Sequence, residues 1–145
     1  MRHQNLIVIL LLILVWGCGK TAPEHQRVAA VDGVVRLQLA AVGDGRVHFF
    51  TFPHEGKNIN FLIRTDGTGT LHSHLDACYS CFKYKLGFIV EARDVVCIAC
   101  RLAYHIEDEF WDYIGACAPI PIHHAIDGES VVIEEALLLQ AARYF

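Results

Sequence analysis

The sequence predicts a mainly β domain of the α+β class, in which an antiparallel meander carries a four-cysteine hairpin module and a short helix ends the chain. Three features of the 145 residues support this prediction. Short runs of alternating apolar and polar residues, separated by turns rich in glycine and aspartate, fill the first half of the chain. Two Cys-x-x-Cys pairs occupy the middle, and the last residues change from alternation to helical spacing.

Four alternating runs predict the strands of the meander. In the first run, Val35 and Leu37 lie on one face of the strand and Arg36 on the other. Glycine and aspartate residues between the runs, at 43–45 and 66–69, indicate tight turns. The predicted strands are residues 31–42, 46–52, 58–64 and 70–75.

The second half of the chain predicts a hairpin, then a strand and a helix. Residues 134–143 have the helical spacing of apolar side chains. The acidic and aromatic residues 107–113 indicate one helical turn or a loop. The predicted strands are residues 87–90 and 94–96, which form the hairpin between the cysteine pairs, and residues 102–106 and 131–133.

The two cysteine pairs predict a metal site. Each Cys-x-x-Cys spacing lets one tight turn direct two sulfurs at one point, and a hairpin between the pairs brings the second pair back onto the first. Four thiolates arranged in this way suit a soft or borderline metal such as zinc or iron. Two disulfides or a redox dithiol are the alternatives that spacing leaves open. The predicted ligands are Cys78, Cys81, Cys97 and Cys100.

The N-terminus predicts export. Arg2 precedes an apolar run at residues 6–16 that is too short to cross a bilayer, which needs about 20 residues. The end of this run resembles a bacterial lipobox, with Trp16 as a departure, so residues 1–17 are predicted to be a lipoprotein signal peptide and Cys18 the lipidated residue. A plain signal peptide with Cys18 as an incidental thiol, or an uncleaved anchor, is the alternative.

These boundaries predict residues 18–27 as the lipidated cysteine and a polar tether, and residues 28–145 as the domain. Gly19, rather than aspartate, follows Cys18, which favours the periplasmic face of the outer membrane if the host is Gram-negative. Lipid chains on Cys18 would make the membrane itself a partner.

Charge and composition exclude several functions. The chain has a formal net charge of −4 and no basic run, which argues against nucleic-acid binding. No catalytic triad, phosphate-binding glycine loop or carboxylate pair stands out. Thioether attachment of haem is disfavoured, because Phe82 and Arg101, rather than histidine, follow the two cysteine pairs.

A fifth cysteine and two histidines are further candidates for metal or thiol chemistry. Pro119 and Pro121, which follow Cys117, restrict the backbone near it, and Cys117 is predicted to be a metal ligand, a reactive thiol or a small buried side chain. His72 and His74 alternate on one strand face just before Cys78, and histidine is a common ligand of borderline metals. Most such histidines are ordinary surface residues, so this alternative stays open as well.

Four motifs occur in one order along the chain, and together they resemble the FtrD-like membrane iron–sulfur protein domain, described as a domain of unknown function. The motifs are Leu-Asp-Ala-Cys-x-x-Cys at 75–81, Lys-Leu-Gly-Phe at 85–88, Val-Cys-x-x-Cys at 96–100 and Gly-Ala-Cys-Ala-Pro-Ile-Pro-Ile at 115–122. The resemblance covers residues 28–145. Ala118 departs from the asparagine of the family, and His72 and His74 have no counterpart in its pattern.

The resemblance implies an iron–sulfur cluster or a single iron held by the cysteines, in ferrous-iron uptake or another redox chain outside the cytoplasm. We therefore expect a membrane-anchored, exported lipoprotein that transfers electrons or handles iron for a membrane permease or redox partner. A structural zinc-binding interaction module and a thiol–disulfide oxidoreductase are the alternatives. A redox or metal-binding protein is expected rather than a stand-alone enzyme.

Overall fold

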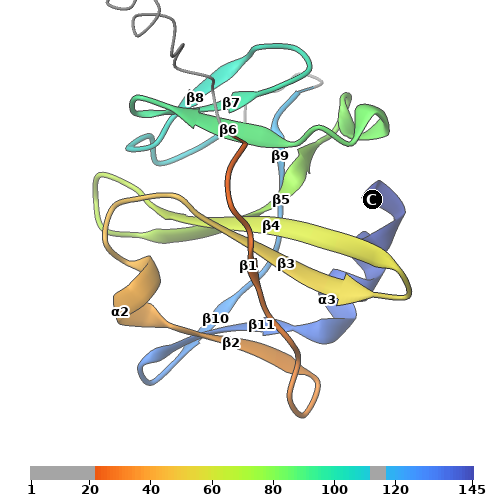
Figure 1. The fold of residues 1–145 in the computed structure, drawn as a ribbon. Coiled ribbons are helices and arrows are strands. Elements are labelled where there is room, and N and C mark those ends of the chain that lie inside the picture. Colours follow the sequence, from red (N-terminus) through yellow and green to blue (C-terminus); the bar gives the residue numbers. More distant parts are fainter. Residues whose placement is uncertain (1–21, 112–116) are drawn as a thin grey trace, which may run out of the picture.

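The structure is a computed structural model that describes residues 22–111 and 117–145 (Figure 1). The predicted signal peptide, the predicted lipidation site Cys18 and the last two residues of the predicted segment 107–113 lie outside the described residues. No helix in the described ranges has both the length and the apolar character needed to span a membrane.

The centre of the molecule is a five-stranded sheet with the order β1-β3-β4-β5-β9. Its middle strands β3, β4 and β5 form the meander, with Phe50 opposite Phe61 and Phe61 opposite Leu75. β1 joins one edge as a parallel strand, and β9 joins the other edge as an antiparallel one. The bounds are β1 Gln26–Arg27, β3 His48–His54, β4 Lys57–Thr65, β5 Leu71–Cys78 and β9 Pro119–Pro121.

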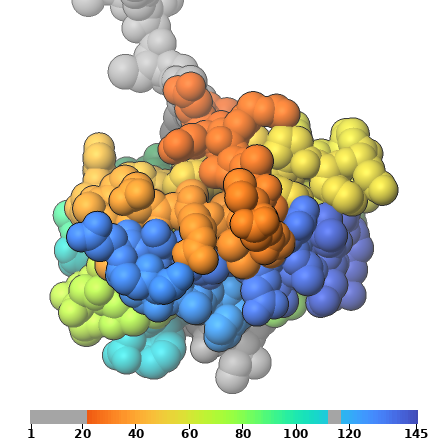
Figure 2. Space-filling view, turned by 90° about the horizontal axis from the view of Figure 1, so that it is seen from below, coloured from red at the N-terminus to blue at the C-terminus, as the bar shows by residue number. Residues whose placement is uncertain are grey.

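Two three-stranded sheets lie on opposite sides of this central sheet (Figure 1). One has the order β6-β7-β8, with β6 Phe88–Glu91, β7 Asp94–Cys97 and β8 Ala103–His105. The other has the order β10-β11-β2, with β10 Ala125–Asp127, β11 Ser130–Glu134 and β2 Val34–Gln38. Figure 2 shows this second sheet from below, where the segment near the N-terminus lies beside the segment near the C-terminus.

The larger hydrophobic core lies between the central sheet and the β10-β11-β2 sheet. Alternation along β4 directs Ile59, Phe61 and Ile63 to this side, and each is fully buried. Helix α3, Glu135–Ala141, adds Leu138, and the short helix η3, Ala142–Tyr144, follows it. Apolar burial on this side therefore stabilises the meander.

A second core lies on the other face of the central sheet, under β6-β7-β8. Leu62 alternates with Phe61 and Ile63, so its side chain enters this core. Phe88, Val95, Tyr104 and Trp111 complete it around the cysteine side chains. The cysteine module is thus attached to the meander by its own apolar contacts.

The structure confirms the mainly β class, the antiparallel meander and the short C-terminal helix. It differs for the predicted strand 31–42, which ends at Gln38 and continues as the one-turn helix α2, Leu39–Val42. β2 pairs with β11 rather than with β3, and Leu39 makes the last bond, donating its backbone N–H to the Glu129 carbonyl at 2.8 Å. The strand ends there because the turn between β10 and β11, at residues 127–130, ends the partner strand β11. Residues 39–42 therefore have no strand of this sheet to pair with.

Candidate metal centre

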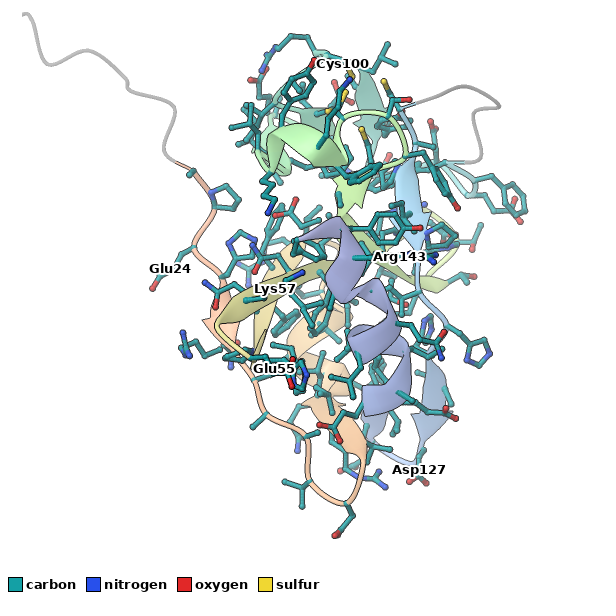
Figure 3. All side chains as sticks on the ribbon, turned by 90° about the vertical axis from the view of Figure 1, so that its right-hand side faces the viewer. Glu24, Glu55, Lys57, Cys100, Asp127 and Arg143 are labelled. Carbon is teal, nitrogen blue, oxygen red and sulfur yellow. The ribbon has the colours of Figure 1, made fainter. Side chains whose placement is uncertain are left out.

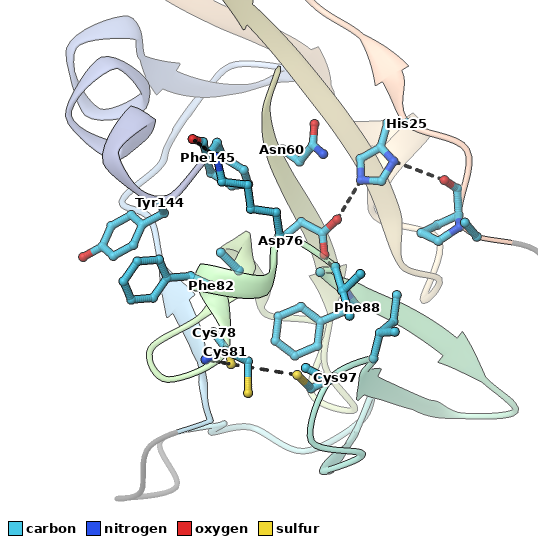
Figure 4. Close-up of a pocket in the computed structure, with 18 residues that line it drawn as sticks. His25, Asn60, Asp76, Cys78, Cys81, Phe82, Phe88, Cys97, Tyr144 and Phe145 are labelled. Atoms are coloured by element: carbon cyan, nitrogen blue, oxygen red, sulfur yellow. Dashed lines mark hydrogen bonds and ion pairs between the residues drawn. The ribbon is translucent and has the colours of Figure 1, made fainter. Parts of the chain in front are cut away.

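Five cysteines from three separate segments converge at the end of the molecule formed by β6-β7-β8. Cys78 ends β5, Cys97 ends β7, and Cys117 lies two residues before β9. Cys81 and Cys100 lie in the turns that follow the first two (Figures 3 and 4). The structure therefore brings the four cysteines of the two predicted pairs together and adds Cys117.

Two backbone turns direct the sulfurs inward. In the first pair, the backbone N–H of Cys81 donates to Cys78 Sγ at 3.0 Å, and the short helix η2, Phe82–Tyr84, continues the turn. In the second pair, Arg101 adopts a left-handed φ of 65° and donates its N–H to the Cys97 carbonyl at 2.9 Å. The pairing of Phe88 with Cys97 in the hairpin holds the second turn over the first.

The sulfur separations match those of a metal site. Cys81 Sγ lies 3.8 Å from Cys117 Sγ, and Cys97 Sγ lies 3.9 Å from Cys78 Sγ. These distances are close to the edge of about 3.8 Å expected for a tetrahedron with metal–sulfur bonds of about 2.3 Å. Two groups of three sulfurs fall within 4.8 Å of one another and share Cys81: one adds Cys78 and Cys117, the other Cys97 and Cys100.

Burial and mutual repulsion keep most of these thiols protonated in the absence of a cation. Burial raises the pKa of Cys97 to about 11 and raises that of Cys81 further, with the hydrogen bond to Cys78 adding to the shift. The pKa of Cys117 is raised by its hydrogen bond with Cys100 and by burial. The pKa of Cys100 is lowered, because hydrogen bonds from the Leu102 backbone and from neighbouring thiols outweigh burial. A donor set of this kind suits a cation that replaces the protons.

One side of the centre is dry and the other faces solvent. Cys78 and Cys97 are buried against the second core, whereas Cys81, Cys100 and Cys117 are partly exposed. Large apolar side chains also stand exposed near the rim, namely Tyr79, Tyr84, Leu86 and Leu102. The centre is therefore shielded from water on the sheet side and accessible from outside.

Asp76 fixes the two halves of the module relative to each other, and the sequence analysis did not identify this role. Its Oδ1 accepts the backbone N–H of Phe88 at 2.7 Å, and its Oδ2 lies 2.8 Å from His25 Nε2 (Figure 4). The buried carboxylate thus ties the start of β6 and the segment before β1 to β5. Asp76 and Gly87 both belong to the FtrD-like motifs at 75–81 and 85–88, and this shared membership is the sequence signal that could have identified the role of Asp76.

His72 and His74 lie towards the other end of β5 and are not brought to the cysteines. His72 Nε2 is 2.8 Å from Asp66 Oδ2, and the His74 ring stacks on Trp111 at 5.0 Å. Within residues 22–111 and 117–145, the side chains whose ligand atoms converge closely enough to hold one metal ion are all cysteines.

A sequence model described as "Membrane iron-sulfur containing protein FtrD-like" matches residues 42–145. That range includes all five described cysteines and the central meander. No curated protein and no solved structure matches the chain.

Proposed function

The chain belongs to the FtrD-like membrane iron–sulfur family, and from this membership we propose that its cysteine cluster holds an iron or iron–sulfur centre for electron transfer at a membrane. The observation that carries the proposal is the convergence of five sulfurs from three segments, in two groups that share Cys81. Iron held by cysteine thiolates supplies a one-electron redox couple. The cluster offers four or five cysteine sulfurs, the soft ligands that iron–sulfur centres use.

The residues of the chain contribute ligation, shielding and orientation. The backbone N–H of Cys81 directed at Cys78 Sγ stabilises negative charge on that sulfur. Phe88 and Tyr104 pack on the sheet side of the cluster and keep water from it. The partly exposed Cys100 lies at the outer side, which suits electron exchange with a redox partner.

We further propose that the protein is exported and anchored through a lipidated Cys18, and that its partner is a membrane permease or a redox protein of the same membrane. The family name supports a membrane location, and the lipobox-like sequence before Cys18 supports the anchor. Cys18→Ser should shift the protein from the membrane fraction to the soluble fraction. Retention of this variant in the membrane would contradict the anchor.

Single substitutions of the four cysteines in the two Cys-x-x-Cys pairs test the proposed centre. Cys78→Ser, Cys81→Ser, Cys97→Ser and Cys100→Ser should each lower the metal bound per chain after anaerobic purification, with the shared Cys81 having the largest effect. Ser80→Ala, in the same turn but without a ligand atom, is the matched control and should keep the full metal content. Unchanged metal in the Cys81 and Cys97 variants would overturn the assignment.

The same experiment separates the two alternatives. A zinc module would bind one colourless metal ion per chain and would not change with reductant. A thiol–disulfide oxidoreductase would contain no metal, and its cysteines would cycle between thiol and disulfide with a measurable potential. The iron proposal requires visible absorption that bleaches on reduction and returns on oxidation.

A further inference from the structure

A cavity of about 190 Å³ lies on the same face of the central sheet as the cysteines but towards the other end of β5. Its walls include Arg64 from β4, His72 and His74 from β5, and Trp111 and His124 from the later loops. Arg64 is paired directly with His72 across β4 and β5, which places both side chains on this face. None of these residues belongs to the proposed metal centre.

Arg64 is the unusual member of this set, because a fully buried guanidinium needs partners. Its Nη1 donates to the carbonyls of Ile106 and Asp108 at 2.8 and 2.7 Å. Its guanidinium also lies 4.0 Å from the centroid of the Trp111 ring. These contacts hold residues 106–111 against the sheet, and they use one nitrogen of the three.

The other two nitrogens, Nε and Nη2, are buried and have no hydrogen-bond partner among residues 22–111 and 117–145. Nε and Nη2 form the side-on edge of the guanidinium, whose parallel N–H groups match the two oxygens of a carboxylate or phosphate. Leaving such donors unpaired in a buried site is costly. The edge formed by Nε and Nη2 is therefore the part of Arg64 that is available to bind a ligand.

His74, beside Arg64, also has a buried nitrogen without a hydrogen-bond partner among the described residues. This nitrogen is Nδ1, and the ring that carries it is buried. The acidic side chains that act on Arg64 are Asp66 and Asp108, and both favour its charged form, but neither bonds to Nε or Nη2. The Asp66 carboxylate is occupied by His72, Thr68 and Thr70, and Glu109 at the cavity is exposed. Two buried, unpaired nitrogen groups thus share one cavity that carries the positive charge of Arg64.

We propose that this cavity binds a small oxyanion, a carboxylate or a phosphate group, whose oxygens accept hydrogen bonds from Nε and Nη2 of Arg64 and from Nδ1 of His74. A metal cation fits this cavity poorly, because Arg64 places a permanent positive charge beside the histidines. The volume is well above the roughly 10–15 Å³ that one water molecule needs, so it accommodates a small anion. The cavity is separate in position from the cysteine centre and needs no metal to act.

Isothermal titration calorimetry of the full chain in detergent tests this proposal, with sodium phosphate and sodium acetate as the two probes at constant ionic strength. The expected result is saturable binding of at least one probe at one site per chain, and the stronger probe identifies the oxyanion class. Sodium chloride at the same ionic strength is the reference, and it should bind more weakly than the stronger probe, because chloride lacks the pair of oxygens that matches the two parallel N–H groups. Absence of saturable binding for both probes would overturn the proposal.

Two variants locate the site, and one controls for general charge effects. Arg64→Lys keeps the charge but removes the side-on edge, and it should weaken binding at least tenfold. His74→Phe keeps an aromatic ring against Trp111 and leaves the bonds from Arg64 to the carbonyls intact, so this variant should fold. It removes Nδ1 and should weaken binding several-fold, which keeps the proposal testable if Arg64→Lys does not fold. Arg36→Lys, at an exposed arginine paired with Asp127, should leave the affinity unchanged. Wild-type affinity in a folded His74→Phe variant would contradict the assignment.

Discussion

At the scale of single residues, the contact between Gly87 and Asp76 sets how closely the two cysteine pairs approach. Gly87 has a left-handed φ of 68°, and a Cβ atom built there would lie 2.6 Å from Asp76 Oδ1. The carboxylate cannot move aside without losing the Phe88 N–H and His25. Glycine at this position therefore serves both the backbone conformation and the space that Asp76 occupies.

Gly87→Ala should lower the free energy of unfolding by about 3–5 kcal/mol, from left-handed strain of about 1–2 kcal/mol and lost hydrogen bonds to a buried charge. Gly128→Ala is the control, because Gly128 has a φ of 59° with nothing within 4 Å of its Cβ position. That variant should lose only the strain, about 1–2 kcal/mol. Denaturant unfolding of both variants measures the difference, and equal losses would contradict the role of Asp76.

Asp66 is a second buried carboxylate whose partners affect the pH dependence of stability. Burial favours its neutral form, but hydrogen bonds from His72, Thr68 and Thr70 outweigh burial and hold its pKa well below the ordinary value of 3.8. A pKa that is lower in the folded state adds stability above the unfolded value, and this stability is lost as the pH falls through the folded value.

The difference in urea midpoint between the wild type and Asp66→Asn should therefore stay constant from neutral pH to about pH 5 and shrink below about pH 4. Chemical unfolding of both proteins across this range measures it. A gap that widens towards low pH would show that the carboxylate is not stabilised by its partners in the folded state.

At the scale of elements, the strand β4 connects the two cores through its alternation. Ile63 points into the larger core and Leu62 into the core around the cysteines, and both are fully buried. The β6-β7-β8 sheet contacts the rest of the domain through this second core. The tightness of the cysteine site should therefore depend on Leu62 more than on its neighbour.

Leu62→Ala and Ile63→Ala should each cost about 2–5 kcal/mol of global stability, as buried large-to-small changes do. Only Leu62→Ala leaves a void beneath the cysteine module, so it should also speed the transfer of bound metal to a chelator. Stopped-flow chelation under conditions in which both variants stay folded makes the comparison. Equal release rates would indicate that the module is held by other contacts.

Local patterning predicted the elements whose signals lie within a few residues. Alternation gave β3, β4, β5 and the β6-β7 hairpin, and the Cys-x-x-Cys spacing gave both inward turns. It missed β9, because Pro119 and Pro121 are poor strand residues, and they fit only because β9 pairs at the edge of the sheet. It also assigned residues 31–42 to the meander, since alternation cannot reveal which sheet a strand joins.

The same limit applies to the candidate site. The spacing predicted four cysteines, but the position of Cys117 against Cys81 depends on the pairing of β9 with β5, a long-range contact. The buried Arg64 gave no signal in the sequence, because an arginine in an alternating run normally indicates the solvent face. Its burial follows from residues 106–111, which fold back over that face of β4.

At the scale of the whole molecule, the two faces of the central sheet have different roles. One face packs on the larger core and provides stability, and the other carries the cysteine centre at one end of β5 and the Arg64 cavity towards the other. Figure 3 shows Cys100 at the end of the molecule opposite Asp127. The exposed apolar residues Tyr79, Tyr84, Leu86 and Leu102 lie close in sequence to the cysteines of this end. This arrangement leaves the cysteine end free to meet a partner.

The central claim is that the cysteine cluster holds one iron-containing redox centre, and the most direct test is the content of iron, zinc and acid-labile sulfide in protein purified anaerobically without added metal. The account predicts iron, with or without sulfide, and visible absorption that bleaches reversibly on reduction by one electron. Zinc alone would make the cluster a structural site. Metal-free protein with its four paired cysteines linked in two disulfides would contradict the claim altogether.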